Sequence, residues 1–224
     1  MTNILNLFKF IAKKEPQYKV PFDLELKQKI KDTPELVTDD DWRTAAGGDI
    51  DISHSKITSL PDNLTVNGSL NLGNTPITSL PNNLTVSGHL NCYNTQITSL
   101  PDNLTVGGDI VISHSKITSL PDNLTVNGHL NCYNTQITSL PDNLTVNGTL
   151  NLGNTPITSL PDNLTVGGVL SLAGSKIEVL PNNLTLSDGY LDLRNTPLAR
   201  IYTRDQILQK LENAGGKINA GIVI

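Results

Sequence analysis

A repeat of twenty residues runs through most of the chain and constrains its fold more than any other feature. Seven segments with the pattern Leu-Pro-Asp/Asn-Asn-Leu-Thr begin at Leu60, Leu80, Leu100, Leu120, Leu140, Leu160 and Leu180. Self-similarity at a fixed short period is typical of solenoids, in which each repeat forms one coil and stacks on its neighbours. We therefore predict a stack of coils rather than an ordinary globular core, and an aromatic content of only 4% agrees with this.

The apolar residues recur at the same positions in every coil and predict which side chains point inward. In the coil that begins at Leu60 they are Leu60, Leu64, Val66, Leu70, Leu72 and Ile77. Apolar and polar residues alternate over 69–73, which is the period of a half-buried strand, so each coil should add one strand to a parallel sheet. Pro61 excludes an interior helix in the returning segment, where we expect extended or polyproline-like backbone.

This pattern, Leu-Pro-x-x-Leu followed ten residues from its start by Leu-x-Leu and then Ile, resembles the bacterial leucine-rich repeats of about twenty residues found in secreted effectors and related phage-encoded proteins. The resemblance covers roughly residues 40–200. It implies an α/β leucine-rich-repeat solenoid with a parallel β-sheet on its concave face. The asparagine with which this family bonds neighbouring coils is replaced here by hydroxyl residues, which can donate and accept in the same buried ladder. These residues are Thr75, Thr95, Ser115, Thr135, Thr155, Ser175 and Thr196.

The ends of the array are expected to carry helical caps, because a solenoid without them exposes the core of its outer coils. Residues 1–39 are predicted to form the N-terminal cap, with helices at 2–14 and 22–31. Residues 40–200 should form about eight coils, the first degenerate and the last with a one-residue insertion near 188–189. In the C-terminal cap, residues 201–224, a capping box at 203–206 predicts a helix, and the apolar tail predicts a final strand.

Composition narrows the classes of function. A net charge of −5 gives no basic surface for nucleic acid. Both cysteines occupy equivalent places in copied segments, which favours a reducing compartment and hence a cytoplasmic protein. The leucine-rich-repeat resemblance implies that this is the cytoplasm of a bacterium, of a phage-infected cell or of a host cell. The apolar N-terminal run is too short to span a membrane, and contact of its helix with a membrane surface is a weaker alternative to a cap. The recurring Asn-Leu-Thr sequons are interpreted as repeat consensus rather than glycan sites.

The sequence shows no catalytic machinery. No glycine-rich loop between a strand and a helix suits a phosphate group, and no serine lies in a nucleophile-elbow context. Cys92 and Cys132 replace the inward-pointing Leu72 of another coil, so both should be small buried apolar residues rather than nucleophiles. We therefore expect a protein that is not an enzyme and that needs no cofactor and no metal.

Candidate binding residues lie on the outward strand positions. Stacking brings His89, Asp109 and His129 into one row; a zinc site and a polar, pH-sensitive surface are the two interpretations, and an open sheet offers poor tetrahedral closure for zinc. Tyr93 and Tyr133 are the leading contacts, because tyrosine contributes strongly to binding energy, although it also simply favours strands. The candidate partner-binding residues are His89, Tyr93, Asp109, His129, Tyr133, Tyr190, Asp192 and Arg194.

Two functions from different classes remain open. The first is a non-catalytic protein–protein interaction module, an effector or inhibitor, that docks a partner protein on its concave face or on its terminal caps. The mildly acidic strand positions favour a partner with a basic or mixed patch. The second is a rigid structural or surface-binding protein, whose rows of threonine contact ice, glycans or other copies of the chain.

Overall fold

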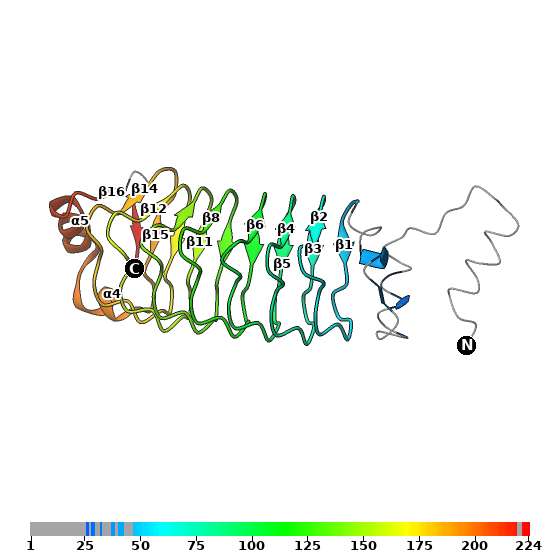
Figure 1. Cartoon of the computed structure of the whole chain (residues 1–224). Helices are drawn as coiled ribbons and strands as arrows, with labels where there is room; N and C mark the ends of the chain where they lie inside the picture. The colour runs from blue at the N-terminus through cyan, green and yellow to red at the C-terminus, as the bar shows by residue number, and fades with distance from the viewer. Residues whose placement is uncertain are drawn as a thin grey trace, which may run out of the picture.

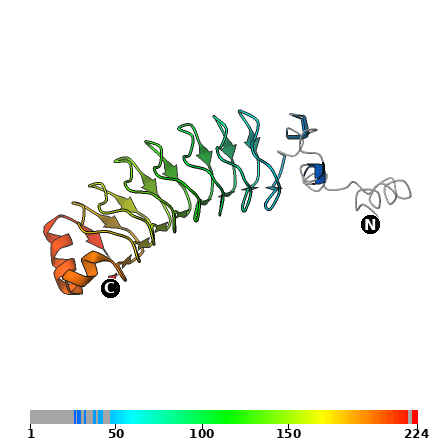
Figure 2. The same cartoon turned by 90° about the horizontal axis from the view of Figure 1, so that it is seen from below.

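The computed structural model describes residues 26, 28, 29, 32, 37, 38, 40–42, 47–218 and 221–224. The repeat forms one elongated parallel β-solenoid, in which coils of twenty residues stack along a single axis (Figures 1 and 2). The predicted stack of coils is therefore confirmed.

The strand predicted in each coil is present, and these strands form one continuous sheet of nine parallel strands. Neighbouring strands pair twenty residues apart, as Leu70 does with Leu90. After the predicted insertion the offset becomes twenty-one, and Leu170 pairs with Leu191. The strands are β1 (Ile50–Asp51), β3 (Leu70–Asn71), β5 (Leu90–Asn91), β7 (Ile110–Val111), β9 (Leu130–Asn131), β11 (Leu150–Asn151), β13 (Leu170–Ser171), β15 (Leu191–Asp192) and β17 (Ile222–Val223).

Each coil from residue 60 onward also contains a second short strand, which the sequence analysis did not predict. Leu64 and Val66 point into the core on either side of an outward Thr65, so the segment alternates like a strand after the turn at Pro61. One set of these strands is three-stranded and comprises β2 (Thr65–Val66), β4 (Thr85–Val86) and β6 (Thr105–Val106). The other is five-stranded and comprises β8 (Thr125–Val126), β10 (Thr145–Val146), β12 (Thr165–Val166), β14 (Thr185–Leu186) and β16 (Lys217–Ile218).

The core lies between the two sets of strands and contains the predicted inward residues. In the coil that begins at Leu60, five of the six predicted side chains are buried, and Leu60 itself is partly buried against them. Because every coil repeats this set, the apolar contacts form rows of similar side chains along the solenoid axis. Cys92 and Cys132 are also fully buried, as predicted, and neither forms a disulfide.

The hydroxyl residues at the end of each first strand are buried as predicted, but they act within one coil rather than between coils. The Oγ1 atom of Thr75 donates to the carbonyl of Leu72 over 2.7 Å, and Thr135 donates to the carbonyl of Cys132 over 2.8 Å. The donor and acceptor are three residues apart, so the bond closes the turn after the strand. A hydroxyl on a short side chain satisfies this carbonyl without entering the neighbouring coil.

Asparagine fixes two turns in the coil because it tolerates a positive φ better than most residues. Asn63 has φ of 58° in the turn after Pro61, and Asn74 has φ of 58° in the turn after β3. The amide of Asn83 donates to Oδ1 of Asn63 over 2.9 Å, and Asn183 bonds Asn163 in the same way over 3.0 Å. The sequon asparagines therefore have a structural role in the repeat, which supports their interpretation as repeat consensus.

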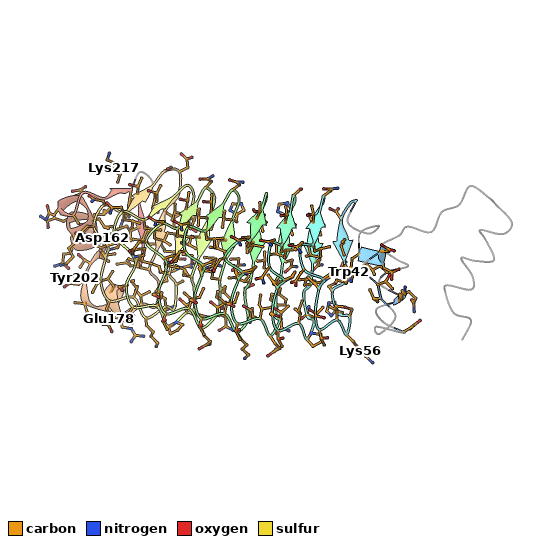
Figure 3. All side chains as sticks on the ribbon, viewed as in Figure 1. Trp42, Lys56, Asp162, Glu178, Tyr202 and Lys217 are labelled. Carbon is orange, nitrogen blue, oxygen red and sulfur yellow. The ribbon has the colours of Figure 1, made fainter. Side chains whose placement is uncertain are left out.

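The N-terminal end is described at single positions. Leu26 and Trp42 are buried in the same apolar cluster as the coils, and Figure 3 shows Trp42 beside the first coil. Leu26, Gln28, Lys29 and Asp32 are helical, which agrees with the helix predicted over 22–31. The helix predicted over 2–14 lies outside the described residues.

At the C-terminal end, two helices, α4 (Pro197–Ile201) and α5 (Arg204–Asn213), follow the last full coil (Figure 1). The predicted capping box is present, since Thr203 accepts from the backbone N–H of Gln206 and the Gln206 side chain accepts from Thr203. After α5 the tail forms β16 and β17, which extend the two sheets by one strand each. The predicted final strand is therefore present, together with a second strand that was not expected.

Replacing Thr135 with valine should lower the free energy of unfolding by about 1 kcal/mol, because one buried hydrogen bond is lost at nearly constant volume. The same substitution at Thr145, an outward and exposed residue of β10, is the matched control and should change it by less than about 0.5 kcal/mol. Urea denaturation followed by circular dichroism measures both. Equal effects at the two positions would contradict this account of the buried hydroxyl.

Candidate interaction surface

The outward side chains of the nine-stranded sheet form three columns, which we call the polar strand face. The strand spacing of about 4.8 Å separates successive members of a column. The first column is Asp49, Ser69, His89, Asp109, His129, Thr149, Val169 and Tyr190. The second column is Asp51, Asn71, Asn91, Val111, Asn131, Asn151, Ser171 and Asp192. The third column is Ser53, Gly73, Tyr93, Ser113, Tyr133, Gly153, Ala173 and Arg194.

The first column links the successive coils from Asp49 to Thr149. The Nδ1 atom of His89 accepts the backbone N–H of Asp109 over 2.9 Å, and Oδ1 of Asp109 accepts the backbone N–H of His129 over 2.7 Å. His129 accepts in turn from Thr149, and Asp49 and Ser69 do the same earlier in the column. Aspartate, serine and histidine all place an acceptor on a short side chain, which explains why these different residues share one position.

The His89–Asp109–His129 row is thus part of this structural ladder. Its members lie in successive coils as predicted, with Nδ1 of His89 3.3 Å from Oδ2 of Asp109. Nδ1 of each histidine accepts a backbone hydrogen bond, which holds the ring in place. Among the described residues there is no group of three or more histidine, cysteine, aspartate or glutamate side chains that could hold a metal ion. The geometry of the row therefore favours the polar-surface interpretation.

The second column closes a turn within most coils. Oδ1 of Asn91 accepts the backbone N–H of Tyr93 over 2.9 Å, and Oδ1 of Asn131 accepts that of Tyr133 over 3.0 Å. Asn71, Asn151 and Asp192 make the same bond to the residue two positions later. This is the turn that asparagine and aspartate favour through their own backbone. The second column consequently fixes the backbone from which the third column projects.

The third column contains an aromatic cluster that the sequence analysis found only in part. The rings of Tyr93 and His114 lie 5.3 Å apart between centroids, at 66° to each other, and His114 lies 5.5 Å from Tyr133. His114 was not predicted as a site residue, because it follows the third column by one position. Its φ of 60° turns the chain there and brings the ring between the two tyrosines. We call Tyr93, His114 and Tyr133 the aromatic cluster.

Neighbouring side chains hold the aromatic cluster in place. The amide of Asn154 donates to the hydroxyl of Tyr133 over 2.7 Å, and the amide of Asn134 lies 3.0 Å from Nδ1 of His114. A Cβ atom on Gly153 would come within 3.0 Å of the Tyr133 ring, so the glycine leaves room for it. Tyr93 keeps 39% of its surface exposed. The cluster is therefore accessible and well ordered by its contacts.

The remaining predicted residues lie at the C-terminal end of the polar strand face, away from the aromatic cluster. Tyr190 is 39% exposed, and the Arg194 guanidinium is largely exposed. Asp192 is only 3% exposed, because Arg194 covers it with bonds of 2.9 Å from Nε and 2.7 Å from the terminal nitrogen. The hydrogen bonds from Arg194 hold the pKa of Asp192 below its usual range. Asp192 orients Arg194 and offers little surface of its own.

The cysteines offer no nucleophile. Burial raises the pKa of Cys92 to about 12, and burial raises the pKa of Cys132 as well. Reactive cysteines need an accessible thiolate, and these two thiols stay protonated inside the core.

Open hollows of about 660, 350 and 230 Å³ lie away from the polar strand face. The largest of these three hollows lies between the segments that contain β10 and β12, and it is lined by Asp142, Asn143, Leu144, Thr145, Asp162, Asn163 and Thr165.

The chain was compared with known proteins. No protein-family model matches it, and no curated protein matches it either. In the described part of the chain, no helix combines the length and the apolar character needed to cross a membrane. Functional inference therefore rests on the geometry of the surface itself.

Replacing Asp192 with asparagine should destabilise the protein by about 1 kcal/mol at pH 7, because the negative charge that accepts the Arg194 hydrogen bonds is lost, while solvent screens the guanidinium, whose side chain is 58% exposed. The pKa of Asp192 is lower in the folded than in the unfolded protein, so its stabilisation is fully present above the unfolded pKa of about 3.9 and is lost as pH falls through the folded pKa. The difference between wild type and Asp192→Asn should therefore shrink below about pH 4. Urea midpoints from pH 7 to 2.5 measure it, and a constant difference would contradict the assignment.

Proposed function

We propose that the protein is a non-catalytic interaction module that binds a partner protein on the polar strand face. The observation that carries the proposal is the aromatic cluster, where two tyrosines and a histidine from three successive coils meet on the outer side of the sheet. Aromatic residues that are fixed but exposed contribute most to binding energy at protein interfaces. The leucine-rich-repeat resemblance would make this face the concave one, where a partner finds the largest continuous surface.

Variation between the coils also favours the polar strand face. The outward position of the second strands is threonine in every coil from Thr65 to Thr185. By contrast, the third column changes from glycine to tyrosine, serine, alanine and arginine along the chain. A surface that recognises one partner needs different side chains at different places, and the polar strand face supplies them.

The order of this surface should help binding. Asn91 and Asn131 accept hydrogen bonds from the backbone N–H groups of the two tyrosines, and Asn154 donates one to the hydroxyl of Tyr133, so these groups are fixed before a partner arrives. A preorganised surface loses less conformational entropy on association. The partly exposed Tyr93 and the polar side chains around it suit a partner that offers both apolar and polar groups. Asp49, Asp51 and Asp109 on the same face favour some basic groups on that partner.

The double substitution Tyr93→Ala with Tyr133→Ala should weaken partner binding by about 30-fold or more, since removal of interface tyrosines commonly costs 2 kcal/mol or more. The immobilised protein would capture its partner from a lysate of the native cell, with quantitative mass spectrometry as readout. The captured partner would then be titrated against both variants.

The matched control is Thr125→Ala with Thr165→Ala, two exposed residues that are also two coils apart but lie on the second strands. This variant should bind as the wild type does. Circular dichroism shows whether both variants keep the fold. If the tyrosine variant binds as well as the control, the contact lies elsewhere, and α5 or the N-terminal end becomes the surface to test.

A second candidate function is favoured by one observation, the row of threonines on the second strands. Thr65, Thr85 and Thr105 pair in register, and so do Thr125, Thr145, Thr165 and Thr185. Most are exposed, and together they present hydroxyl groups at a regular spacing. Such a row would suit ice, a glycan or a second copy of the chain. Thermal hysteresis, glycan-array binding or concentration-dependent assembly would support this function, and a monomer with none of them would exclude it.

A further inference from the structure

The second strands do not form one sheet along the solenoid. Thr105–Val106 in β6 ends the three-stranded sheet, and Thr125–Val126 in β8 begins the five-stranded one, although they lie in consecutive coils (Figure 1). At the preceding junction Thr105 donates to the carbonyl of Leu84, and at the following one Thr145 donates to that of Leu124. The structure records no equivalent backbone bond from Thr125 or Asn127 to the coil before them.

Packing is looser at the same junction. Leu104 is the one partly exposed leucine at its position in the repeat, while its equivalents in the six other described coils are at most 5% exposed. A hollow of about 230 Å³ lies there, between Asp102, Leu104 and Val106 on one side and Asn123, Thr125 and Asn127 on the other. A larger hollow of about 660 Å³ lies between the coils of β10 and β12, which stay paired, so a hollow alone does not distinguish this junction. The missing bonds and the partly exposed leucine are the two signs of the opening.

A glycine lies beside the break. Gly107 lies so close to the preceding coil that a Cβ atom there would come 2.1 Å from the carbonyl oxygen of Ser87, so the glycine lets its coil approach the coil before it. Most other coils carry asparagine or serine at this position, and only Gly167 repeats the glycine. The junction after Gly167 stays paired through β12 and β14, so the glycine accompanies the break but does not by itself produce it.

The opposite side of the same two coils stays closed. The backbone N–H of Ile110 donates to the carbonyl of His129 over 2.9 Å, and that of His114 donates to Tyr133 over 2.9 Å. The ring of His114 also contacts the ring of Tyr133 across this junction. One side of the solenoid is thus continuous where the other is interrupted.

We propose that this junction is a hinge, at which the coils up to residue 119 bend relative to the coils from residue 120. The unbroken β7–β9 pairing acts as the axis, and the gap between β6 and β8 opens and closes. The aromatic cluster of the polar strand face lies beside this axis, where bending displaces it least. The inference concerns the fold itself and holds whether or not that surface binds a protein.

Hydrogen exchange tests the opening with an internal control. The heptapeptides 122–128 and 142–148 are identical, Asp-Asn-Leu-Thr-Val-Asn-Gly, so their amides have nearly the same intrinsic exchange rates. Resolved by NMR, the amides of Thr125 and Asn127 should exchange at least about 100-fold faster than those of Thr145 and Asn147. Equal protection in the two segments would overturn the proposal.

Spin labels test the bending. Asp62→Cys with Asp122→Cys spans the junction, and Asp122→Cys with Asn182→Cys does not, while both exposed pairs are three coils, about 14 Å, apart. The buried native cysteines should not react with the label. Pulsed dipolar EPR should give a broader distance distribution for the spanning pair. Equal widths would overturn the hinge even if exchange were rapid, since they would indicate separated strands without bending.

Discussion

The backbone hydrogen bonds between the paired strands of neighbouring coils are the interaction on which the rest of the structure depends. Strands of two residues are too short to be stable alone, and each is held because its partners lie twenty residues before and after it. This requirement fixes the coil length. Even the inserted residue before β15 is absorbed outside the strand, so that Leu191 still pairs with Leu170.

Side chains extend the same principle. The first column accepts backbone N–H groups from the next coil, the second column closes turns, and the buried hydroxyls satisfy carbonyls at the end of each strand. Histidine and aspartate in this setting are structural residues with an exposed edge. A row that suggests metal chemistry in the sequence is thus explained by the need to hold coils together.

Much of the fold could be predicted from the sequence because it follows from a period. The positions of Leu70 and Leu72 predicted a strand, and the apolar residues predicted the core with little error. The second strand was not predicted, because Pro61 favours extended or polyproline-like backbone in this segment. The alternation of Leu64 and Val66 around Thr65 is the pattern that indicates the strand. The break between β6 and β8 depends on how closely two coils approach each other, which periodicity does not report.

The candidate surface was predicted less completely for a different reason. Tyr93 and Tyr133 follow from strand alternation, but His114 joins them only because its backbone adopts a positive φ. Asp192 is buried, unlike most members of its column, because the Arg194 side chain covers it and donates hydrogen bonds to its carboxylate. The sequence alone does not predict this side-chain conformation. Side-chain conformation, unlike strand register, is not encoded by the repeat.

The three columns have different structural roles, and this limits how many outward positions are available to recognise another molecule. Two of the columns consist largely of acceptor groups that the solenoid itself requires, which leaves the third column as the most variable one. Any molecule lying along the sheet would therefore meet about one variable side chain per coil, at a pitch of about 4.8 Å. The side chain presented at this position therefore differs from coil to coil along the chain, while the backbone pairing of the repeat stays the same.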